Sequence, residues 1–348
     1  MMILTLFSKN NLLIKPLKER SKMQLVINTY GSYLHVKQSS FEIKTDEKKK
    51  RISAKKIDSI LITTGAAISS DAVKLALENN IEIQFLDKFG QSMGKVWHPK
   101  MGSTTYIRRR QLEIAETEEG TEIIKDLMIK KTENMIDHLY DLGLKRSNEK
   151  QQYLNDKIEK IENLKSKLIN IDGLIDEIRN SIMGLEGNIA RKYFKALSYL
   201  MPEDYQFNGR SFRPAEDEFN CLLNYGYGVL YSKVEKAVIL AGLDPYVGIL
   251  HTDNYNKKSF VFDFIEPYRH HIDRIVMKLF SRKKVRKSHF DEIKNGLTLN
   301  EEGKKLLISN LNDYFEERVR YKGKEFKIKD TIQYDCHTIA NRLIDSGD

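Results

Sequence analysis

The hydrophobic pattern of this chain changes its period near residue 97. Before that point, short β-branched runs such as 24–28, 57–63 and 82–86 alternate with turns, which is typical of strands. Ser70 can cap one short helix among them. Farther along the chain, apolar residues recur every three or four positions, which indicates helices. We therefore expect an α+β chain, with a small β-sandwich that contains one short helix, followed by a larger all-α domain.

The same pattern predicts the domain boundaries. The β-rich domain occupies residues 23–96, and the helical domain occupies residues 106–348. Residues 97–105 contain a proline and a glycine and lack periodicity, so we interpret them as a linker. Residues 1–22 precede the periodic pattern and are either an extension or the result of a start assigned too far upstream.

Apolar stripes predict helices over about 124–142 and 154–168, and further helices follow them in the second domain. The approximate ranges of these further helices are 174–200, 218–240, 269–280, 304–319 and 332–344.

The charge of the chain favours a polyanionic partner. It has 58 basic and 49 acidic residues and a net charge of +9 at pH 7, which suits nucleic acid or an anionic membrane surface. No run approaches the about 18 apolar residues that a membrane span needs. The two cysteines, Cys221 and Cys336, stand far apart, which excludes a disulfide framework. We expect a cytoplasmic protein that does not associate with a membrane.

An acidic residue borders the apolar stripe of the predicted helix 174–200. Glu186 lies about one turn from the apolar positions on either side of it, and Gly184 and Gly187 flank it. A glycine inside a helix costs about 1 kcal/mol relative to alanine. Two of them beside one carboxylate suggest that a ligand or another backbone approaches closely there. A helix break or a tight helix crossing is the alternative.

A histidine and two further carboxylates follow in an apolar context. His251 ends an apolar segment, and Asp263 and Glu266 stand 12 and 15 residues beyond it. A spacing of three residues places both carboxylates on one side of a helical turn. One imidazole and two carboxylates suit Mg²⁺ or Mn²⁺ and leave positions for phosphate oxygens and water. Zinc is not favoured, because the chain has neither a cysteine ligand set nor the H-E-x-x-H pattern.

Basic and aromatic residues near these acids are candidates for DNA contacts. Segment 278–287 carries six basic residues in ten positions and could follow a phosphate backbone, although a solvated helix end would have the same composition. Arg210 could bind phosphate or pair with Asp217, and Tyr225 could stack on a base or pack in the core. The candidate DNA contacts are Arg210, Arg213, Tyr225, Lys278, Arg282, Lys283, Lys284 and Arg286.

Four motifs, taken in order, resemble the CRISPR-associated Cas-one family of spacer-acquisition integrases. The motifs are Leu185-Glu186-Gly187, then Arg213-Pro214 with Asn220 and Leu223-Asn224-Tyr225-Gly226-Tyr227, then Gly248-Ile249-Leu250-His251, and finally Asp263-Phe264-Ile265-Glu266. The resemblance covers about residues 108–280, and the β-rich segment also resembles the family's N-terminal domain. Each motif alone is weak, whereas the ordered set is specific.

The resemblance implies a fold, a site and a reaction. It implies a homodimer packed largely through the β domains, and a helical catalytic domain in which Glu186, His251 and Glu266 bind Mg²⁺ or Mn²⁺. Asp263 matches a further acidic position and would support the site or serve as an alternative ligand. The implied partners are double-stranded DNA with 3′ ends and a small CRISPR adaptation protein, Cas-two.

The implied reaction is attack of a DNA 3′-hydroxyl on a phosphodiester at the repeat boundary. A plain metal-dependent nuclease, a transposon-associated relative and a non-catalytic nucleic-acid scaffold are the alternatives. The chain departs from the family at Glu266, where aspartate is the commoner ligand, and in the residues before Met23, which have no counterpart.

Overall fold

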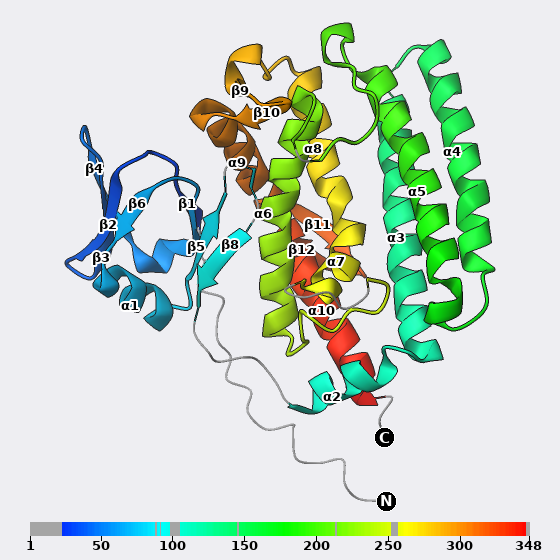
Figure 1. Cartoon of the computed structure of the whole chain (residues 1–348), viewed down its shortest axis with the longest axis horizontal. Helices are drawn as coiled ribbons and strands as arrows, with labels where there is room; N and C mark the ends of the chain where they lie inside the picture. Colours follow the sequence, from blue (N-terminus) through cyan, green and yellow to red (C-terminus); the bar gives the residue numbers. More distant parts are fainter. Residues whose placement is uncertain are drawn as a thin grey trace, which may run out of the picture.

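The computed structural model describes residues 23–345 apart from 88, 91, 98–104, 145, 213 and 252–256. The β-rich N-terminal region and the largely helical C-terminal region that the sequence predicts are both present (Figure 1). The predicted linker 97–105 lies almost entirely outside the described residues, as do residues 1–22.

Two four-stranded sheets face each other in the N-terminal domain. The first has the order β1 (Met23–Ile27), β5 (Ile57–Ile62), β7 (Glu82–Leu86) and β8 (Ser92–Val96), in which only β8 pairs antiparallel. The second has the order β4 (Lys49–Ser53), β3 (Ser40–Lys44), β2 (Ser32–Lys37) and β6 (Ala66–Ile68), with β2 and β6 parallel. Helix α1 (Ser70–Glu78) is capped by Ser69, whose side-chain oxygen accepts a hydrogen bond from the Ala72 amide. The predicted cap, Ser70, is instead the first residue of the helix.

Strand β5 is buried on both faces and joins the cores of the two domains. Ile60 and Ile62 point into the core between the two sheets. Leu61, whose side chain points to the opposite face because a strand has a period of two residues, belongs to the core of the helical domain. The first sheet therefore forms one wall of the helical domain.

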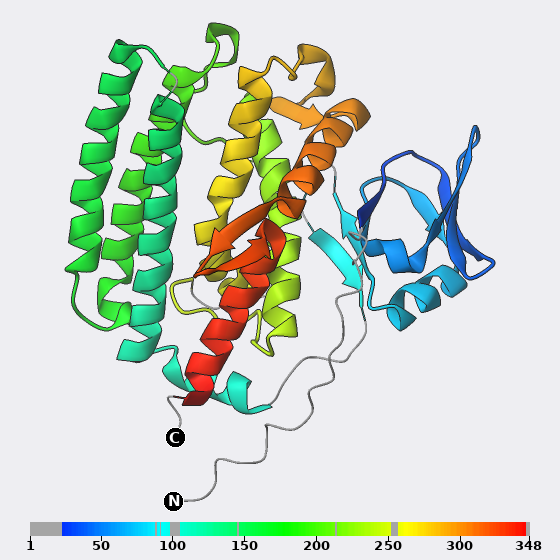
Figure 2. The same ribbon diagram turned by 180° about the vertical axis from the view of Figure 1, so that it is seen from behind.

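The helical domain consists of long helices and two small hairpins. Its helices are α2 (Thr105–Ile114), α3 (Glu118–Gly143), α4 (Asn148–Ile169), α5 (Ile175–Leu200), α6 (Glu218–Leu240), α7 (Ser259–Ile265), α8 (Arg269–Ser281), α9 (Glu301–Glu316) and α10 (Ile328–Asp345). Helices α3, α4 and α5 form one layer, and α6 and α8 lie between it and the β domain (Figure 1). Seen from behind, α10 and the hairpin before it cover α6 (Figure 2).

The two hairpins are absent from the sequence-based prediction, which expected only helices in this domain. They pair β9 (Phe290–Ile293) with β10 (Gly296–Leu299), and β11 (Arg318–Tyr321) with β12 (Lys324–Lys327). The helix predicted over 304–319 ends at Glu316, and Val319 lies in β11. Within the described residues, no helix has the length and apolar composition to cross a membrane.

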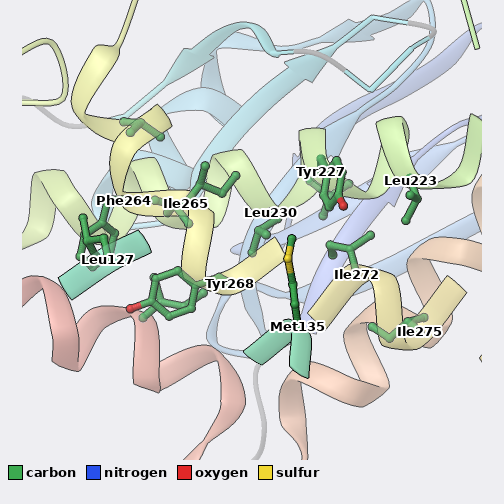
Figure 3. Packing of buried hydrophobic residues seen from close by; sticks show 14 of the residues in the cluster. Leu127, Met135, Leu223, Tyr227, Leu230, Phe264, Ile265, Tyr268, Ile272 and Ile275 are labelled. Carbon is green, nitrogen blue, oxygen red and sulfur yellow. The ribbon is translucent and has the colours of Figure 1, made fainter. Parts of the chain in front are cut away.

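The core of the helical domain holds α3, α6, α7 and α8 together. Figure 3 shows Met135 of α3 beside Leu230 of α6 and Ile272 of α8, and Leu127 of α3 beside Phe264 of α7. The helices α6 and α8 approach closely, since a Cβ added at Gly226 would lie 2.4 Å from the Cγ2 atom of Ile272. This packing fixes the relative positions of the elements that carry the candidate site.

A contact between two glycines lets the β domain dock on helix α6. A Cβ added at Gly228 would lie 1.7 Å from the carbonyl oxygen of Gly90, in the turn between β7 and β8. Lys95 of β8 adds an ion pair of 2.6 Å to the buried Glu235 of α6. Because a backbone atom cannot move away as a flexible side chain can, position 228 tolerates only glycine.

We expect Gly228→Ala to lower the free energy of unfolding by at least about 2 kcal/mol, because the methyl group overpacks a rigid contact. Gly184→Ala on α5 is the matched control. Its added Cβ meets nothing within 4 Å, so alanine should raise stability by about 0.5–1 kcal/mol through helix propensity. Urea unfolding of both variants measures the difference, and an unchanged midpoint for Gly228→Ala would contradict the docking contact.

Candidate active site

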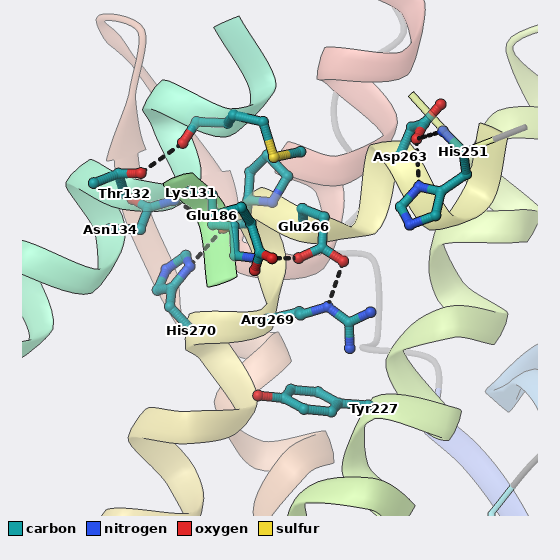
Figure 4. A network of polar contacts seen from close by, with 12 residues as sticks. Lys131, Thr132, Asn134, Glu186, Tyr227, His251, Asp263, Glu266, Arg269 and His270 are labelled. Atoms are coloured by element: carbon teal, nitrogen blue, oxygen red, sulfur yellow. Dashed lines mark hydrogen bonds and ion pairs between the residues drawn. The ribbon is translucent and has the colours of Figure 1, made fainter. Parts of the chain in front are cut away.

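Two of the predicted ligands, Glu186 and Glu266, converge on one buried cation. Glu186 comes from the middle of α5, and Glu266 begins the 3₁₀ turn Glu266–Tyr268 that links α7 to α8. The ammonium of Lys131, on α3, donates hydrogen bonds to Oε1 of Glu186 and, at 2.6 Å, to Oε2 of Glu266. Figure 4 shows the two carboxylates pointing toward each other at this position.

The glycines beside Glu186 leave the surface open. A Cβ added at Gly184 or Gly187 would meet nothing within 4 Å, and helix α5 continues without a break through both. A helix break and a tight helix crossing, the alternatives that the sequence allowed, are therefore wrong. The Glu186 side chain itself is 34% exposed, so a ligand can reach its carboxylate from this side.

Glu266 is ionised although it is buried. Burial alone would raise its pKa, but the charges of Arg269 and Lys131 hold the pKa of Glu266 at about 2. The Arg269 Nε atom lies 2.8 Å from Oε1 of Glu266. Burial would likewise lower the pKa of Lys131, but the charges of Glu266 and Glu186 raise it above its usual value. The site thus contains a charged pair of glutamates balanced by two cations.

His251 is oriented by Asp263. The fully buried carboxylate of Asp263 lies 2.6 Å from the His251 Nδ1 atom and accepts hydrogen bonds from the backbone amides of Ile249, Leu250 and His251 at 2.7, 3.1 and 3.0 Å. In the neutral ring, donation to this carboxylate places the proton on Nδ1 and leaves Nε2 as the nitrogen with the lone pair. This is the tautomer that a metal-binding histidine needs.

The segment that carries His251 is also held from α5. The Arg179 Nη1 atom donates to the carbonyl oxygens of Ile249 and Leu250 at 3.0 and 2.6 Å. Asp263 therefore accepts hydrogen bonds from three amides of this loop, and Arg179 donates to two of its carbonyl oxygens. Asp263 and Glu266, which the sequence places on one side of a turn, point to different partners (Figure 4).

The donor set fits a hard divalent cation, although its members do not yet surround one point. Among the described residues, no three His, Cys, Asp or Glu side chains lie close enough to hold a metal ion together. Lys131 occupies the space between the two glutamates. Two carboxylates that already pair with a cation, and one imidazole, are nevertheless the ligands that Mg²⁺ or Mn²⁺ would take.

The candidate DNA contacts Arg210 and Tyr225 have partners within the protein. Arg210 donates to the side-chain oxygens of Asn220 and, at 2.7 Å, of Asn224, rather than pairing with Asp217. Tyr225 is only 1% exposed and packs against Gly90, which is the core packing left open by the sequence. As the structure stands, Tyr225 cannot stack on a base. Arg213 lies outside the described residues.

The basic segment is exposed but remote from the glutamates. Its members Lys278, Arg282, Lys283, Lys284 and Arg286 are all exposed. They follow the far end of α8, whose first turn holds Arg269. At about 1.5 Å per helical residue, that end lies about 20 Å from the site, so this segment is not beside the predicted metal.

Sequence reasoning missed Lys131, Arg269 and Arg179. Lys131 did carry a signal, because it occupies a position on the apolar stripe of α3 where Leu127 and Met135 lead one to expect another hydrophobic residue. A lysine on a buried stripe needs an acidic partner. Arg269 and Arg179 lie in charged sequence contexts that give no comparable signal.

Three histidines near the site, the buried His138 and the partly buried His270 and His271, should make the fold sensitive to acid. Burial, together with nearby positive charges, lowers the pKa of His270 to about 3 and the pKa values of His138 and His271 well below the ordinary 6.5. The unfolded chain therefore binds protons below pH 6.5 that the folded chain does not, so stability is lost as pH falls.

Relative to pH 7, each of these histidines should lower the free energy of unfolding at pH 5 by about 2 kcal/mol, or by about 6 kcal/mol together. We expect urea denaturation at pH 5 and pH 7 to show a steep loss, and His138→Gln to remove about a third of it. His337→Gln, which changes an exposed ring, is the control. If His138→Gln retained the full loss, His138 would not be buried as described.

Comparisons with known proteins match the whole architecture. A family model described as CRISPR associated protein Cas1 matches residues 25–313. The CRISPR-associated endonuclease Cas1 1 of Archaeoglobus fulgidus is 31% identical over 322 residues, which is 89% of this chain and 93% of that protein.

Two solved structures show the same fold. A casposase bound to integration product has a TM-score of 0.79 and 24% identity, covering 93% of this chain and 91% of that one. A Cas6-RT-Cas1–Cas2 complex has a TM-score of 0.77 and 22% identity, covering 94% of this chain and 35% of that one. With a family model matching most of its length and a relative more than 30% identical, this chain belongs to the CRISPR-associated Cas1 family.

Proposed function

We propose that this protein is a metal-dependent DNA integrase of CRISPR adaptation. It joins the 3′-hydroxyl ends of short duplex DNA, the new spacers, to phosphodiesters at the repeat boundary. Glu186, His251 and Glu266 hold Mg²⁺ or Mn²⁺. The observation that carries the proposal is the convergence of two carboxylates from different helices on one buried cation, together with a histidine whose ring is oriented by a buried aspartate.

Each residue has a defined task in this proposal. Arg269 keeps Glu266 ionised inside the protein, so that its carboxylate is always ready to bind a cation. Asp263 holds the His251 ring in one tautomer and one orientation. A divalent ion bound by these ligands would polarise the phosphoryl group and lower the pKa of the attacking hydroxyl.

The named relatives support the choice of substrate and partner. The Archaeoglobus relative is named an endonuclease, the casposase structure holds an integration product, and another structure contains Cas1 with Cas2. We propose that this chain likewise acts on DNA, as a homodimer packed through its β domains and together with a small Cas2-type partner. Its basic net charge is compatible with that substrate.

A strand-transfer assay tests the proposal. A labelled short duplex with 3′-hydroxyl ends is incubated with a supercoiled plasmid that carries a repeat, with Mn²⁺ or with EDTA, and with or without the small partner. The matched control is the same duplex with 3′-deoxy ends, which cannot attack. We expect joined product only with Mn²⁺ and 3′-hydroxyl ends.

The other outcomes lead to different functions. Plasmid cleavage that is equal for both duplexes, with no joined product, would show a nuclease in which water replaces the 3′-hydroxyl. Binding of the duplex without either reaction would support a scaffold that only holds nucleic acid.

A further inference from the structure

Lys131 is an unusual residue for the interior of a protein. It is 5% exposed and lies on the face of α3 that packs in the core of the helical domain. A buried ammonium is costly unless it is paired and hydrogen-bonded. Among the described residues, its ion-pair partners are Glu186 and Glu266, two of the three predicted metal ligands.

The ammonium therefore stands where the two carboxylates would meet a metal ion. A divalent cation and an ammonium repel each other strongly at such short range in a partly buried site. Lys131 and the metal cannot both bridge the same two carboxylates. Binding of the metal requires the ammonium to leave at least one of them.

Contacts of neighbouring side chains hold the turn of α3 that carries Lys131. The neighbouring Lys130 points to another group and lies 2.5 Å from the Asp335 carboxylate. One turn further on, the side-chain amide of Asn134 donates to the carbonyl oxygen of Pro267 at 2.8 Å. Both contacts tie this turn of α3 in place, whereas the lysine side chain has several rotatable bonds.

The exposure of the partners indicates the side on which the ammonium can leave. The Glu186 side chain is 34% exposed and the Glu266 side chain is 10% exposed. The open surface beside Glu186 is the one left by the two glycines. If the Lys131 ammonium stays with Glu186 and moves toward the surface, it is hydrated again. This hydration lowers the free-energy cost of displacing it with a metal ion.

We propose that Lys131 is the resident counter-cation of the site. It keeps Glu186 and Glu266 facing each other in the metal-free protein and yields its place when a divalent ion binds. This inference rests on the proposed function, because it takes the two glutamates as metal ligands. Lys131 is thus a positioning residue that also competes with the metal and sets the affinity of the site for it.

The proposal predicts opposite effects on stability and on metal affinity. Without metal, Lys131→Met leaves two facing carboxylates with only Arg269 to balance them, so the melting temperature in EDTA should fall by several degrees. The same variant has no ammonium to displace, so it should bind Mn²⁺ about tenfold more tightly than the wild type, a coupling of ordinary size for two ligands of one site. A substitution that only damaged the fold would weaken metal binding instead.

The experiment is calorimetric titration of the full-length protein with Mn²⁺, together with thermal unfolding in EDTA and in saturating Mn²⁺. Lys125→Met is the matched control, because Lys125 lies on the same helix and forms an i,i+3 ion pair with the exposed Glu122, away from the candidate ligands. It should titrate like the wild type. If Lys131→Met does not fold, Lys131→Gln, which keeps hydrogen bonding but removes the charge, carries the same expectation.

The outcomes separate this inference from the proposed function. Unchanged or weaker Mn²⁺ binding by Lys131→Met, with binding lost in Glu266→Gln, would overturn the counter-cation and leave the metal site intact. Wild-type Mn²⁺ binding by Glu186→Gln and Glu266→Gln would overturn the metal site itself, and the proposed function with it.

Discussion

Glu266→Gln is expected to reduce strand transfer by on the order of a thousandfold or more, because residues that act as one catalytic unit fail together when one of them is lost. Glutamine has the size of glutamate but cannot supply the charged oxygen that a divalent ion needs. Glu186→Gln and His251→Ala should have losses of similar size. The single-turnover rate of joining, measured at saturating Mn²⁺, gives the comparison.

The control must separate lost chemistry from a lost fold. Glu266→Gln leaves Lys131 and Arg269 short of one buried negative charge, so some loss of stability, up to about 3–5 kcal/mol, is expected as well. Glu302→Gln, on the exposed first turn of α9, is the surface control and should join DNA like the wild type. The Kd of Glu266→Gln for the duplex should stay within about threefold of the wild-type Kd, a difference below 1 kcal/mol in binding free energy. Joining at more than a tenth of the wild-type rate would contradict the role of Glu266.

Asp263→Asn is expected to slow joining by about 10–100-fold at limiting Mn²⁺, since residues that orient a metal-binding histidine contribute about that much to metal affinity or activity. Both oxygens of Asp263 accept from donors: Oδ2 from the amides of Ile249 and Leu250, and Oδ1 from His251. Whichever way an asparagine amide turns, its NH₂ group faces an N–H donor. Either the imidazole is released or the loop opens.

A titration of the joining rate with Mn²⁺ distinguishes this effect from loss of a ligand. The Mn²⁺ concentration for half-maximal rate should rise in Asp263→Asn, and excess metal should recover part of the rate. Glu266→Gln should show no such recovery. Wild-type metal dependence in Asp263→Asn would show that the contact with His251 does not orient the ring.

The sequence predicts the architecture well where the pattern is long and regular. Helix α5 lies within one residue of its predicted range, and strand β5 within one residue of the run that signals it. The hairpin β11–β12 escaped prediction because its four-residue strands are rich in charge and follow a helix without a break in polarity. Short strands of this kind depend on pairing that one sequence does not reveal.

The candidate site shows a similar division. The spacing of His251, Asp263 and Glu266 reflects local geometry, and the structure brings Asp263 to His251 as a supporting acid would lie. The partner Lys131, however, is 55 residues from Glu186 and 135 from Glu266. Tyr225 meets Gly90 of the other domain. Such contacts depend on how distant elements pack against each other. An amphipathic side chain such as that of Tyr225 can pack in a core or contact a ligand, so its residue type does not decide between the two.

One measurement tests the three-residue metal site most directly. Crystals of the full chain are soaked in MnCl₂, and anomalous scattering is recorded at the manganese edge. We expect one strong peak within bonding distance of carboxylate oxygens of Glu186 and Glu266 and of Nε2 of His251, with the Lys131 ammonium moved away from at least one glutamate. A manganese peak elsewhere, or none between these side chains with Lys131 still bridging them, would contradict this metal site.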